Sequence, residues 1–187
     1  MKKQIYQMKI SLKGSKPLVW RRFLVKSHIT FQLLHETIQE IMGWTHTHLY
    51  EFNFGKIIIT DAESIQESSN SENEIDSAKT KLEDLISEEK EKILYTYDFG
   101  DDWGHEVIVE KILPDNSDLK NPVCLAGKNA CPPEDCGGIY GYFELLDILK
   151  NPKHPEYDER LEWLGENFDP AEFDMETANK TLSQLKW

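Results

Sequence analysis

The sequence has 187 residues, a mass of 21.8 kDa and a formal net charge of −13. That length suits a single domain, and a hydrophobic share of 39% supplies a core, which excludes a chain that is disordered throughout. No segment approaches the run of about 20 apolar residues that a membrane span needs, and the basic N-terminus lacks the apolar stretch of a secretory signal. Because three cysteines also argue against a disulfide framework, we expect one soluble, cytoplasmic domain over residues 1–187.

Charge is distributed unevenly along the chain. Residues 1–35 hold eight Lys or Arg and no Asp or Glu, whereas residues 36–187 hold the other 13 basic residues and all 34 acidic ones. The acidic body repels a nucleic-acid backbone, so we do not expect nucleic acid to bind through it. The N-terminal cations either form a local basic face or are solvated residues paired with acidic neighbours. They are Lys9, Lys13, Lys16, Arg21, Arg22 and Lys26.

The first half of the chain predicts strands around one helix. Apolar residues alternate over residues 4–12, and residues 18–26 are β-prone, so each predicts a strand. Thr30 can cap a helix that runs to about Met42 and stops at Gly43. A hairpin over residues 48–60 follows.

Residues 61–80 differ from their surroundings in composition. They contain 13 Asp, Glu, Ser or Asn and no aromatic residue, which predicts a mobile acidic loop within the domain. A short helix is predicted around residues 80–87. Two more strands, over residues 92–99 and 103–113, are joined by a turn at residues 100–102.

The last third of the chain predicts mostly helices. Residues 114–138 are rich in loop formers, and helical patterns follow at about residues 139–150, 155–164 and 174–185. Since most strands precede these helices, we predict an α+β fold. Its single mixed or antiparallel sheet carries one early helix packed on it, with a C-terminal cluster of about three helices.

His46 and His48 form the first candidate site segment. On a strand, both side chains would point to the same side, because side chains alternate with a period of two. Two imidazoles on one side suit zinc or another transition metal. An ordinary hydrogen-bonded pair explains the same spacing.

The segment of residues 95–106 holds three Asp and one His among aromatic residues. One interpretation is that Asp98, Asp101 or Asp102 joins His105 in holding a metal or a polar ligand. The other is a tight acidic turn in which an Asp side chain binds turn amides, with Trp103 in the core. The Asp-Phe-Gly tripeptide does not indicate a kinase, because the other kinase motifs are absent.

The third candidate segment contains Cys124, Cys131 and Cys136. One interpretation is a zinc site in which Cys131 and Cys136 chelate the ion and Cys124 or His154 completes the shell, although the spacing departs from structural zinc motifs. The stiff Pro132-Pro133 pair predicts a preset loop that fixes Glu134 and Asp135. Fixed carboxylates suit a binding site and equally suit a structural helix cap.

Five short motifs follow one another along the chain. In order they are Val19-Trp20-Arg21-Arg22, then Gly43-Trp44 with His48-Leu49 and Phe52, then Tyr97-Asp98-Phe99-Gly100-Asp101 with Trp103 and His105, then Cys131-Pro132-Pro133-Glu134-Asp135 with Gly137-Gly138 and Gly141-Tyr142, and last Phe168-Asp169 with Phe173 and Asn179. Together they resemble the Ri-plasmid ORF-three-like family, and the resemblance extends from about residue 4 to residue 182. His46 and Cys136 lie outside the pattern, and residues 61–80 fall where such proteins vary.

The resemblance implies an α+β fold in a family from bacteria and archaea that is often carried on plasmids and mobile elements. Some of its members carry the label of transposon resolvase. A serine recombinase needs a nucleophilic serine, an arginine cluster and a DNA-binding arm, whereas this chain has an acidic body and no helix-turn-helix signature. The residues therefore do not support that label.

Three functions remain open. The first is a non-catalytic module that binds an unknown small molecule or protein partner in a polar-aromatic pocket. The residues expected to line it are Arg21, Arg22, His48, Asp98, Asp101, Trp103, His105, Glu134 and Asp135. The second is a metal-dependent hydrolase that uses His48, Asp98, Asp101 and His105 as metal ligands, with Glu134 or Asp135 as general base. The third is a DNA-associated accessory protein of a plasmid or mobile element. The sequence identifies neither a cofactor nor a catalytic residue.

Overall fold

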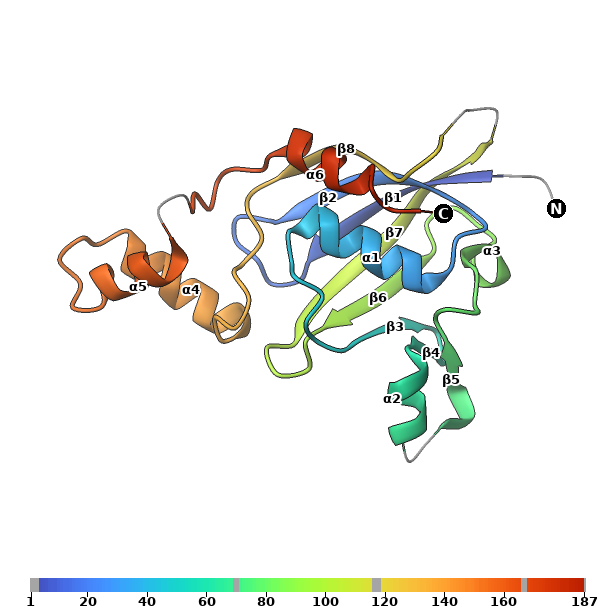
Figure 1. Ribbon diagram of the computed structural model, residues 1–187, viewed down its shortest axis with the longest axis horizontal. Coiled ribbons are helices and arrows are strands. Elements are labelled where there is room, and N and C mark those ends of the chain that lie inside the picture. The colour runs from blue at the N-terminus through green and yellow to red at the C-terminus, as the bar shows by residue number, and fades with distance from the viewer. Residues whose placement is uncertain (1–3, 69–70, 116–118, 166–167, 187) are drawn as a thin grey trace.

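A computed structural model describes residues 4–68, 71–115, 119–165 and 168–186 of the chain (Figure 1). The strands are β1 (Gln4–Leu12), β2 (Trp20–Lys26), β3 (Tyr50–Phe54), β4 (Ile57–Thr60), β5 (Glu74–Asp76), β6 (Lys92–Tyr97), β7 (Trp103–Pro114) and β8 (Val123–Lys128). The α-helices are α1 (Phe31–Met42), α2 (Ala62–Glu67), α3 (Leu82–Leu85), α4 (Gly138–Leu149), α5 (Tyr157–Leu164) and α6 (Met175–Leu182), and a 3₁₀ turn η1 spans Ser71–Asn73. None of the helices in the described ranges is long and apolar enough to cross a membrane.

All eight strands join one sheet in the order β5-β4-β3-β6-β7-β1-β2-β8. Neighbouring strands are antiparallel except β4 and β5, which run parallel. The predicted α+β class with a single mixed sheet is therefore confirmed. The pairing of β3 with β6 brings Tyr50 opposite Tyr97, and this register places the start of β3 beside the end of β6.

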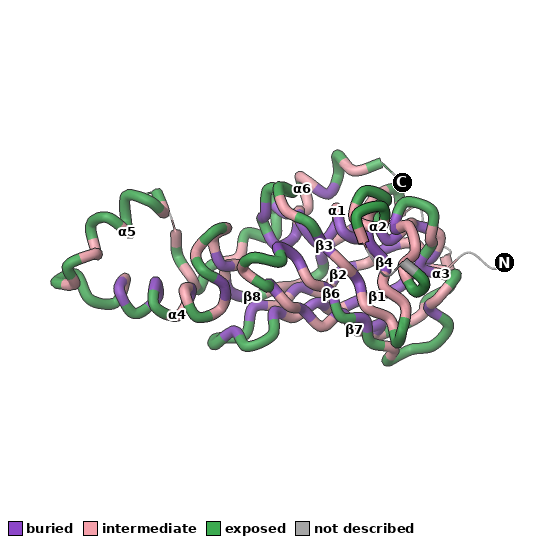
Figure 2. Tube along the Cα trace, turned by 90° about the horizontal axis from the view of Figure 1, so that it is seen from below, coloured by how far each residue is buried: buried purple, intermediate pink, exposed green. Residues whose placement is uncertain are grey.

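Helix α1 covers one face of the sheet, and α6 lies on the same side (Figure 2). The Thr30 hydroxyl accepts a hydrogen bond from the Leu33 N–H at 3.2 Å, and Gly43 ends the helix with a φ of 90°. The Phe31 ring of α1 packs edge-on against Phe52 of β3. Because strand side chains alternate, residues facing α1 are buried while their neighbours face solvent on the other side of the sheet.

The C-terminal helices do not form the expected single cluster. Helices α4 and α5 pack on each other and project from one end of the molecule, as Figures 1 and 2 show. Helix α6 instead packs on α1 and β8, where it buries Ala178 and Leu182. The periodic pattern identified amphipathic helices but carried no information about which surface each one covers.

Two segments predicted to be loops contain regular structure. Within residues 61–80, Asp61 caps α2, and the three-residue strand β5 pairs with β4. Strand β8 lies within the stretch 114–138. Both strands are short edge strands, so few of their residues are buried and the alternation that marks a strand is weak.

Asn179 protects the free edge of β8. Its Oδ1 accepts a hydrogen bond from the Cys124 N–H at 2.8 Å, and its Nδ2 donates to the Cys124 carbonyl oxygen at 3.0 Å. The side-chain amide thus occupies the place of a neighbouring strand, which blocks pairing with another chain.

Replacing Asn179 with alanine is expected to lower the free energy of unfolding by about 2 kcal/mol. The change leaves the N–H and the carbonyl of the buried Cys124 without partners. Urea unfolding followed by circular dichroism measures it. Asn151→Ala is the matched control, since the Asn151 side chain, in an exposed turn, accepts the Lys153 N–H and has no other hydrogen bond among the described residues. An equal effect of both substitutions would show that the edge contact adds no stability.

Candidate functional site

The candidate site lies where β3 begins and β6 ends. His48 stands just before β3, and Asp98 directly follows β6. The two segments are tied together because the Asp98 N–H donates to the Leu49 carbonyl oxygen at 2.9 Å. A third segment, the loop of Glu134 and Asp135 before α4, completes the group.

Three carboxylates converge on one ring nitrogen of His48. Its Nε2 lies 3.3 Å from Glu134 Oε2, 3.5 Å from Asp135 Oδ1 and 3.8 Å from Asp98 Oδ2. Asp98 is buried and Asp135 is exposed, so the group runs from the protein interior to solvent. We call His48, Asp98, Glu134 and Asp135 the His48 cluster.

Glu134 is held as a fixed anion. Its carboxylate accepts hydrogen bonds from the Thr45 N–H at 2.7 Å, the Thr47 hydroxyl at 2.9 Å and the Tyr97 hydroxyl at 3.1 Å. Partial burial raises the pKa of Glu134, but these hydrogen bonds outweigh burial and leave the pKa below its ordinary value. Thr45 and Thr47 were not predicted as site residues, because no spacing in the sequence links them to Glu134.

The loop that carries Glu134 is anchored from two sides. The Trp44 indole N–H donates to the Pro132 carbonyl oxygen at 3.2 Å, and its ring stacks on Tyr97. The Asp101 carboxylate accepts the Gly137 N–H at 3.2 Å. Gly138, with a φ of 66°, passes so close to the Asp101 carbonyl that a Cβ there would clash with it.

Asp98 and Asp101 also shape their own turn. Asp98 has a φ of 57°, and its Oδ1 accepts the Gly100 N–H at 2.9 Å. Asp101 faces the Gly137 amide rather than His48. Asp98 therefore both stabilises its own turn and belongs to the His48 cluster, so both predicted roles of this segment apply to it. Asp101 instead holds the loop that carries Glu134.

A metal ion would find three suitable ligands in the His48 cluster. One ligand atom from each of His48, Asp98 and Asp135 lies within 4.8 Å of the other two. Among the described residues, no other three His, Cys, Asp or Glu side chains bring their ligand atoms this close together. Of the four predicted ligands His48, Asp98, Asp101 and His105, the structure thus brings together only His48 and Asp98. The third possible ligand is Asp135, which was predicted as a general base.

The two predicted site arginines lie elsewhere, on opposite faces of β2. Arg21 is buried: its Nε donates to the Ile41 carbonyl oxygen, and its Nη1 donates to the carbonyls of Trp20 and Lys128. Arg22 lies on the solvent side of the sheet, where it forms two hydrogen bonds with the Glu110 carboxylate. Neither side chain reaches the His48 cluster.

Trp103 and His105 belong to the core beneath α1. Both are almost completely buried, and His105 Nδ1 lies 3.3 Å from the Tyr95 carbonyl oxygen. Burial lowers the pKa of His105 to about 4. The Trp44 ring packs edge-on against the His105 ring, which excludes His105 from the set of exposed ligands.

His46 and His48 do not share one strand face. Residues 45–49 precede β3 as a bend, and His46 has a φ of 60°. Its Nε2 lies 3.3 Å from Glu40 Oε1, away from His48. The expected same-side pair is therefore wrong, because its two residues are not extended.

The three cysteines are free thiols that form no disulfide. Burial raises the pKa of Cys131 far above its ordinary value and that of Cys136 to about 12. No cysteine belongs to the group of possible metal ligands found among the described residues, so the structure gives the zinc interpretation no support.

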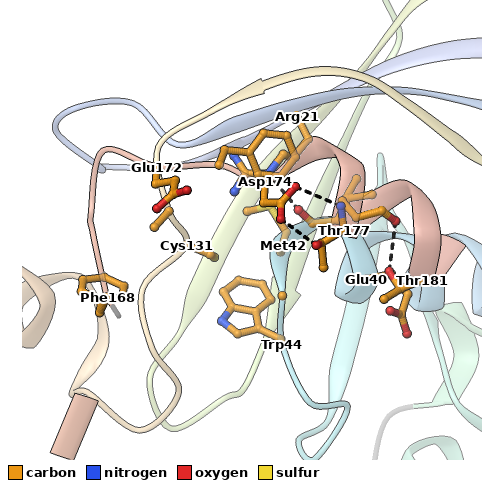
Figure 3. A pocket seen from close by; sticks show the side chains of 15 residues that line it. Arg21, Glu40, Met42, Trp44, Cys131, Phe168, Glu172, Asp174, Thr177 and Thr181 are labelled. Carbon is orange, nitrogen blue, oxygen red and sulfur yellow. Dashed lines mark hydrogen bonds between the residues drawn. The ribbon is translucent and has the colours of Figure 1, made fainter. Parts of the chain in front are cut away.

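A groove with aromatic walls adjoins the His48 cluster. It consists of two hollows of about 230 and 410 Å³ that share Met42, Gly43, Trp44, Cys131 and Phe168. The smaller hollow also has Glu134 in its lining. Figure 3 shows the larger hollow with Trp44, Cys131 and Phe168 around it, and Arg21 and Asp174 also belong to its lining.

The fold and the site define an α+β protein in which a single mixed sheet, covered on one face, presents a cluster of one histidine and three carboxylates beside an aromatic groove. The chain belongs to the plasmid pRiA4b ORF-3-like protein family, whose model matches residues 4–177. The family expected from the five motifs is therefore confirmed.

Two relatives span nearly the whole chain. The uncharacterized protein y4hQ of Sinorhizobium fredii is 33% identical over 187 residues, which cover 98% of this chain and 94% of that protein. The crystal structure of MM3350, a protein of unknown function from Methanosarcina mazei Go1, matches with a TM-score of 0.83 and 38% identity. That match covers 94% of this chain and 98% of the solved one.

Proposed function

We propose that the protein is a non-catalytic ligand-binding module and that the His48 cluster binds a divalent cation. The observation that carries this proposal is the convergence of three carboxylates, from two separate segments, on one imidazole nitrogen. Imidazole and carboxylate ligands together suit zinc or manganese. A cation at this position relieves the mutual repulsion of the three carboxylates.

The adjoining groove supports binding of a larger ligand next to the ion. Its lining is mainly apolar, and Glu134 is common to the groove and the cluster. Ligand sites typically combine an apolar hollow with a few fixed polar groups. An organic molecule coordinated to the ion would place its apolar part against Trp44 and Phe168.

A hydrolase is less well supported than a binding module. A general base works best when its pKa lies near the working pH, whereas three hydrogen bonds lower the pKa of Glu134. His105 lies in the core and is unable to serve as a ligand. Asp135 is the remaining candidate for a base, and its side chain is largely exposed to water.

DNA binding through the N-terminal cations is also less well supported. Arg22 is neutralised by Glu110, and Lys26 lies 3.6 Å from an Asp115 carboxylate oxygen. Arg21 is buried. These contacts favour the interpretation of the basic residues as charges that pair with acidic neighbours.

Isothermal titration of the chelator-treated protein with zinc or manganese tests the proposal. We expect the full-length chain to bind one ion, and Asp98→Asn and His48→Gln each to weaken binding at least tenfold. An asparagine at position 98 retains an oxygen for the Gly100 N–H, so the turn is expected to persist.

Matched controls are Asp158→Asn on exposed α5 and His28→Gln, which both lie outside the His48 cluster. Circular dichroism of each variant checks that it is folded. Wild-type protein that binds neither ion, or binding that survives both cluster substitutions unchanged, would contradict the proposal.

A further inference from the structure

A second hollow lies between α1 and residues 61–78, away from the His48 cluster and its groove. Its volume is about 390 Å³, and it shares no lining residue with either groove hollow. The helix contributes Gln32, His35 and Glu36, and Tyr50 of β3 lies against them. The opposite wall consists of Asp61, Ala62, Asp76, Ser77 and Ala78, and His46 completes the lining.

His35 forms the floor of this hollow. Its side chain is almost fully buried, with the residue only 6% exposed, and its ring stacks on Tyr50 with a centroid distance of 3.6 Å. On the core side, His35 Nδ1 lies 2.8 Å from the Tyr95 hydroxyl oxygen. The other ring nitrogen, Nε2, has no hydrogen-bond partner among the residues that the structure describes.

The hydrogen-bond chain behind His35 determines where its ring proton lies. Gln39 Oε1 accepts the His46 N–H at 3.1 Å, so the Gln39 amide nitrogen donates to the Tyr95 hydroxyl oxygen at 3.1 Å. The fully buried Tyr95 hydroxyl must then donate its own hydrogen, and His35 Nδ1 is the acceptor within reach. His35 Nδ1 therefore carries no hydrogen, and the neutral ring carries its hydrogen on Nε2.

The ring lines the hollow and carries an N–H that none of the described residues accepts, so water or a ligand can accept it. Burial lowers the pKa of His35 to about 3, so the ring remains neutral at physiological pH. A protonated Nε2 has no lone pair for a metal ion, which excludes His35 as a metal ligand in this arrangement. A hydrogen-bond acceptor on a ligand would take the place of water at this donor.

The wall of the hollow is acidic. Glu36, Asp61 and Asp76 line it, and no Lys or Arg in the described parts of the chain does so. Asp76 is partly neutralised by Lys79, while Asp61 keeps its charge as the cap of α2. A ligand in this hollow therefore meets negative charge on its sides and a neutral N–H donor at its base.

We propose that the hollow binds a small organic ammonium ion whose neighbouring carbonyl or hydroxyl oxygen accepts the His35 Nε2–H. The ammonium group faces Glu36 and Asp61, and the oxygen faces the ring. Anions are disfavoured by the wall, and neutral molecules gain the hydrogen bond without the charge attraction. This site is independent of the His48 cluster.

Nuclear magnetic resonance of ¹⁵N-labelled full-length protein at pH 7.5 tests the proposal. Long-range ¹H–¹⁵N spectra are expected to show His35 as the Nε2–H tautomer. Titration with glycinamide, which has an ammonium group beside a carbonyl oxygen, is expected to shift the His35 ring signals with a dissociation constant of roughly 1 mM. Acetamide is expected to bind at least tenfold more weakly, and glycolate not to bind.

A charge-removing variant gives the second readout. Replacing His35 itself would also remove the acceptor of Tyr95, so we choose Glu36→Gln, which keeps an oxygen for the Gln32 amide. Glycinamide affinity is expected to fall at least fivefold in Glu36→Gln and to remain unchanged in the remote Glu159→Gln. Any of three results would overturn the proposal: an Nδ1–H tautomer, a preference for glycolate over glycinamide, or unshifted His35 signals. The last applies at a glycinamide concentration 20 times the expected dissociation constant.

Discussion

Replacing Arg21 with methionine is expected to lower the free energy of unfolding by about 3 kcal/mol or more. Arg21 joins three parts of the fold: its own strand β2, the C-terminal end of α1 through Ile41, and the edge strand β8 through Lys128. Methionine matches its length but donates no hydrogen bond. Three carbonyl oxygens would lose their partner at once.

The surroundings of Arg21 explain why its charge is tolerated. Burial lowers the pKa of Arg21 to about 10, so the guanidinium is still protonated at neutral pH. Its neighbours are carbonyl dipoles and the ring of Phe173, whose centroid lies 3.7 Å from Arg21 Cζ. Ile41 lies at the negative end of the α1 dipole, which adds a further attraction.

Arg22 provides a matched control within the same strand. Its guanidinium pairs with Glu110 on the solvent side, and exposed ion pairs contribute about 1 kcal/mol or less. Arg22→Met is therefore expected to have a small effect. Arg21→Lys should remain destabilised, because one ammonium group does not reproduce the planar fork that reaches three carbonyls.

Urea unfolding of the three variants, with the slope of the transition compared as well as its midpoint, measures these differences. If Arg21→Met and Arg22→Met unfold alike, then the buried hydrogen bonds of Arg21 contribute nothing beyond a surface charge. Ion binding at the His48 cluster is expected to survive in Arg21→Met wherever the variant is folded, since Arg21 does not contact that cluster.

The different fates of Arg21 and Arg22 illustrate what the sequence could predict. Alternation places Arg21 on the same face as Val19, Phe23 and Val25, which are all buried. The opposite face also carries apolar residues, Trp20 and Leu24, so the pattern alone did not distinguish the core side. That choice depends on α1 and β8, which pack on β2 from distant parts of the chain.

The His48 cluster was predictable to a similar degree. The density of polar and aromatic residues in the candidate segments indicated one set that includes His48, Asp98, Glu134 and Asp135, and the structure places these four together. The same reasoning included Trp103 and His105, which lie on the α1 side of β7 instead. The register of β3 against β6 places His48 beside Asp98. This pairing joins residues far apart in the sequence, so no single segment predicts it.

Acid is expected to destabilise the protein between pH 6.5 and about pH 4, before most carboxylates titrate. Burial lowers the pKa of His105 to about 4 and that of His35 to about 3, while an unfolded histidine has a pKa of about 6.5. The unfolded state therefore binds more protons in this window, and stability falls as pH falls. The stabilisation that the two neutral histidines contribute is complete above pH 6.5. It is lost as the pH falls toward their pKa values in the folded protein.

The magnitude follows from the number of protons taken up on unfolding. Each proton contributes a slope of about 1.4 kcal/mol per pH unit, so two buried histidines give a slope of up to about 2.8 kcal/mol per unit near pH 5. His105→Leu removes one titrating group and is expected to halve that slope. Val107→Ala, two residues along the same buried face of β7, is expected to lower the whole curve without changing its slope.

Urea unfolding at half-unit intervals from pH 7 to pH 4.5 gives the slope for each protein. A wild-type slope near zero would mean that both rings remain unprotonated on unfolding or are already charged in the folded protein. The second case conflicts with the position of His105, whose Nε2 is buried and has no hydrogen-bond partner among the residues that the structure covers. A charge there would lack both water and a counterion, which is why the neutral ring, and with it the acid sensitivity, follows from the packing of the core.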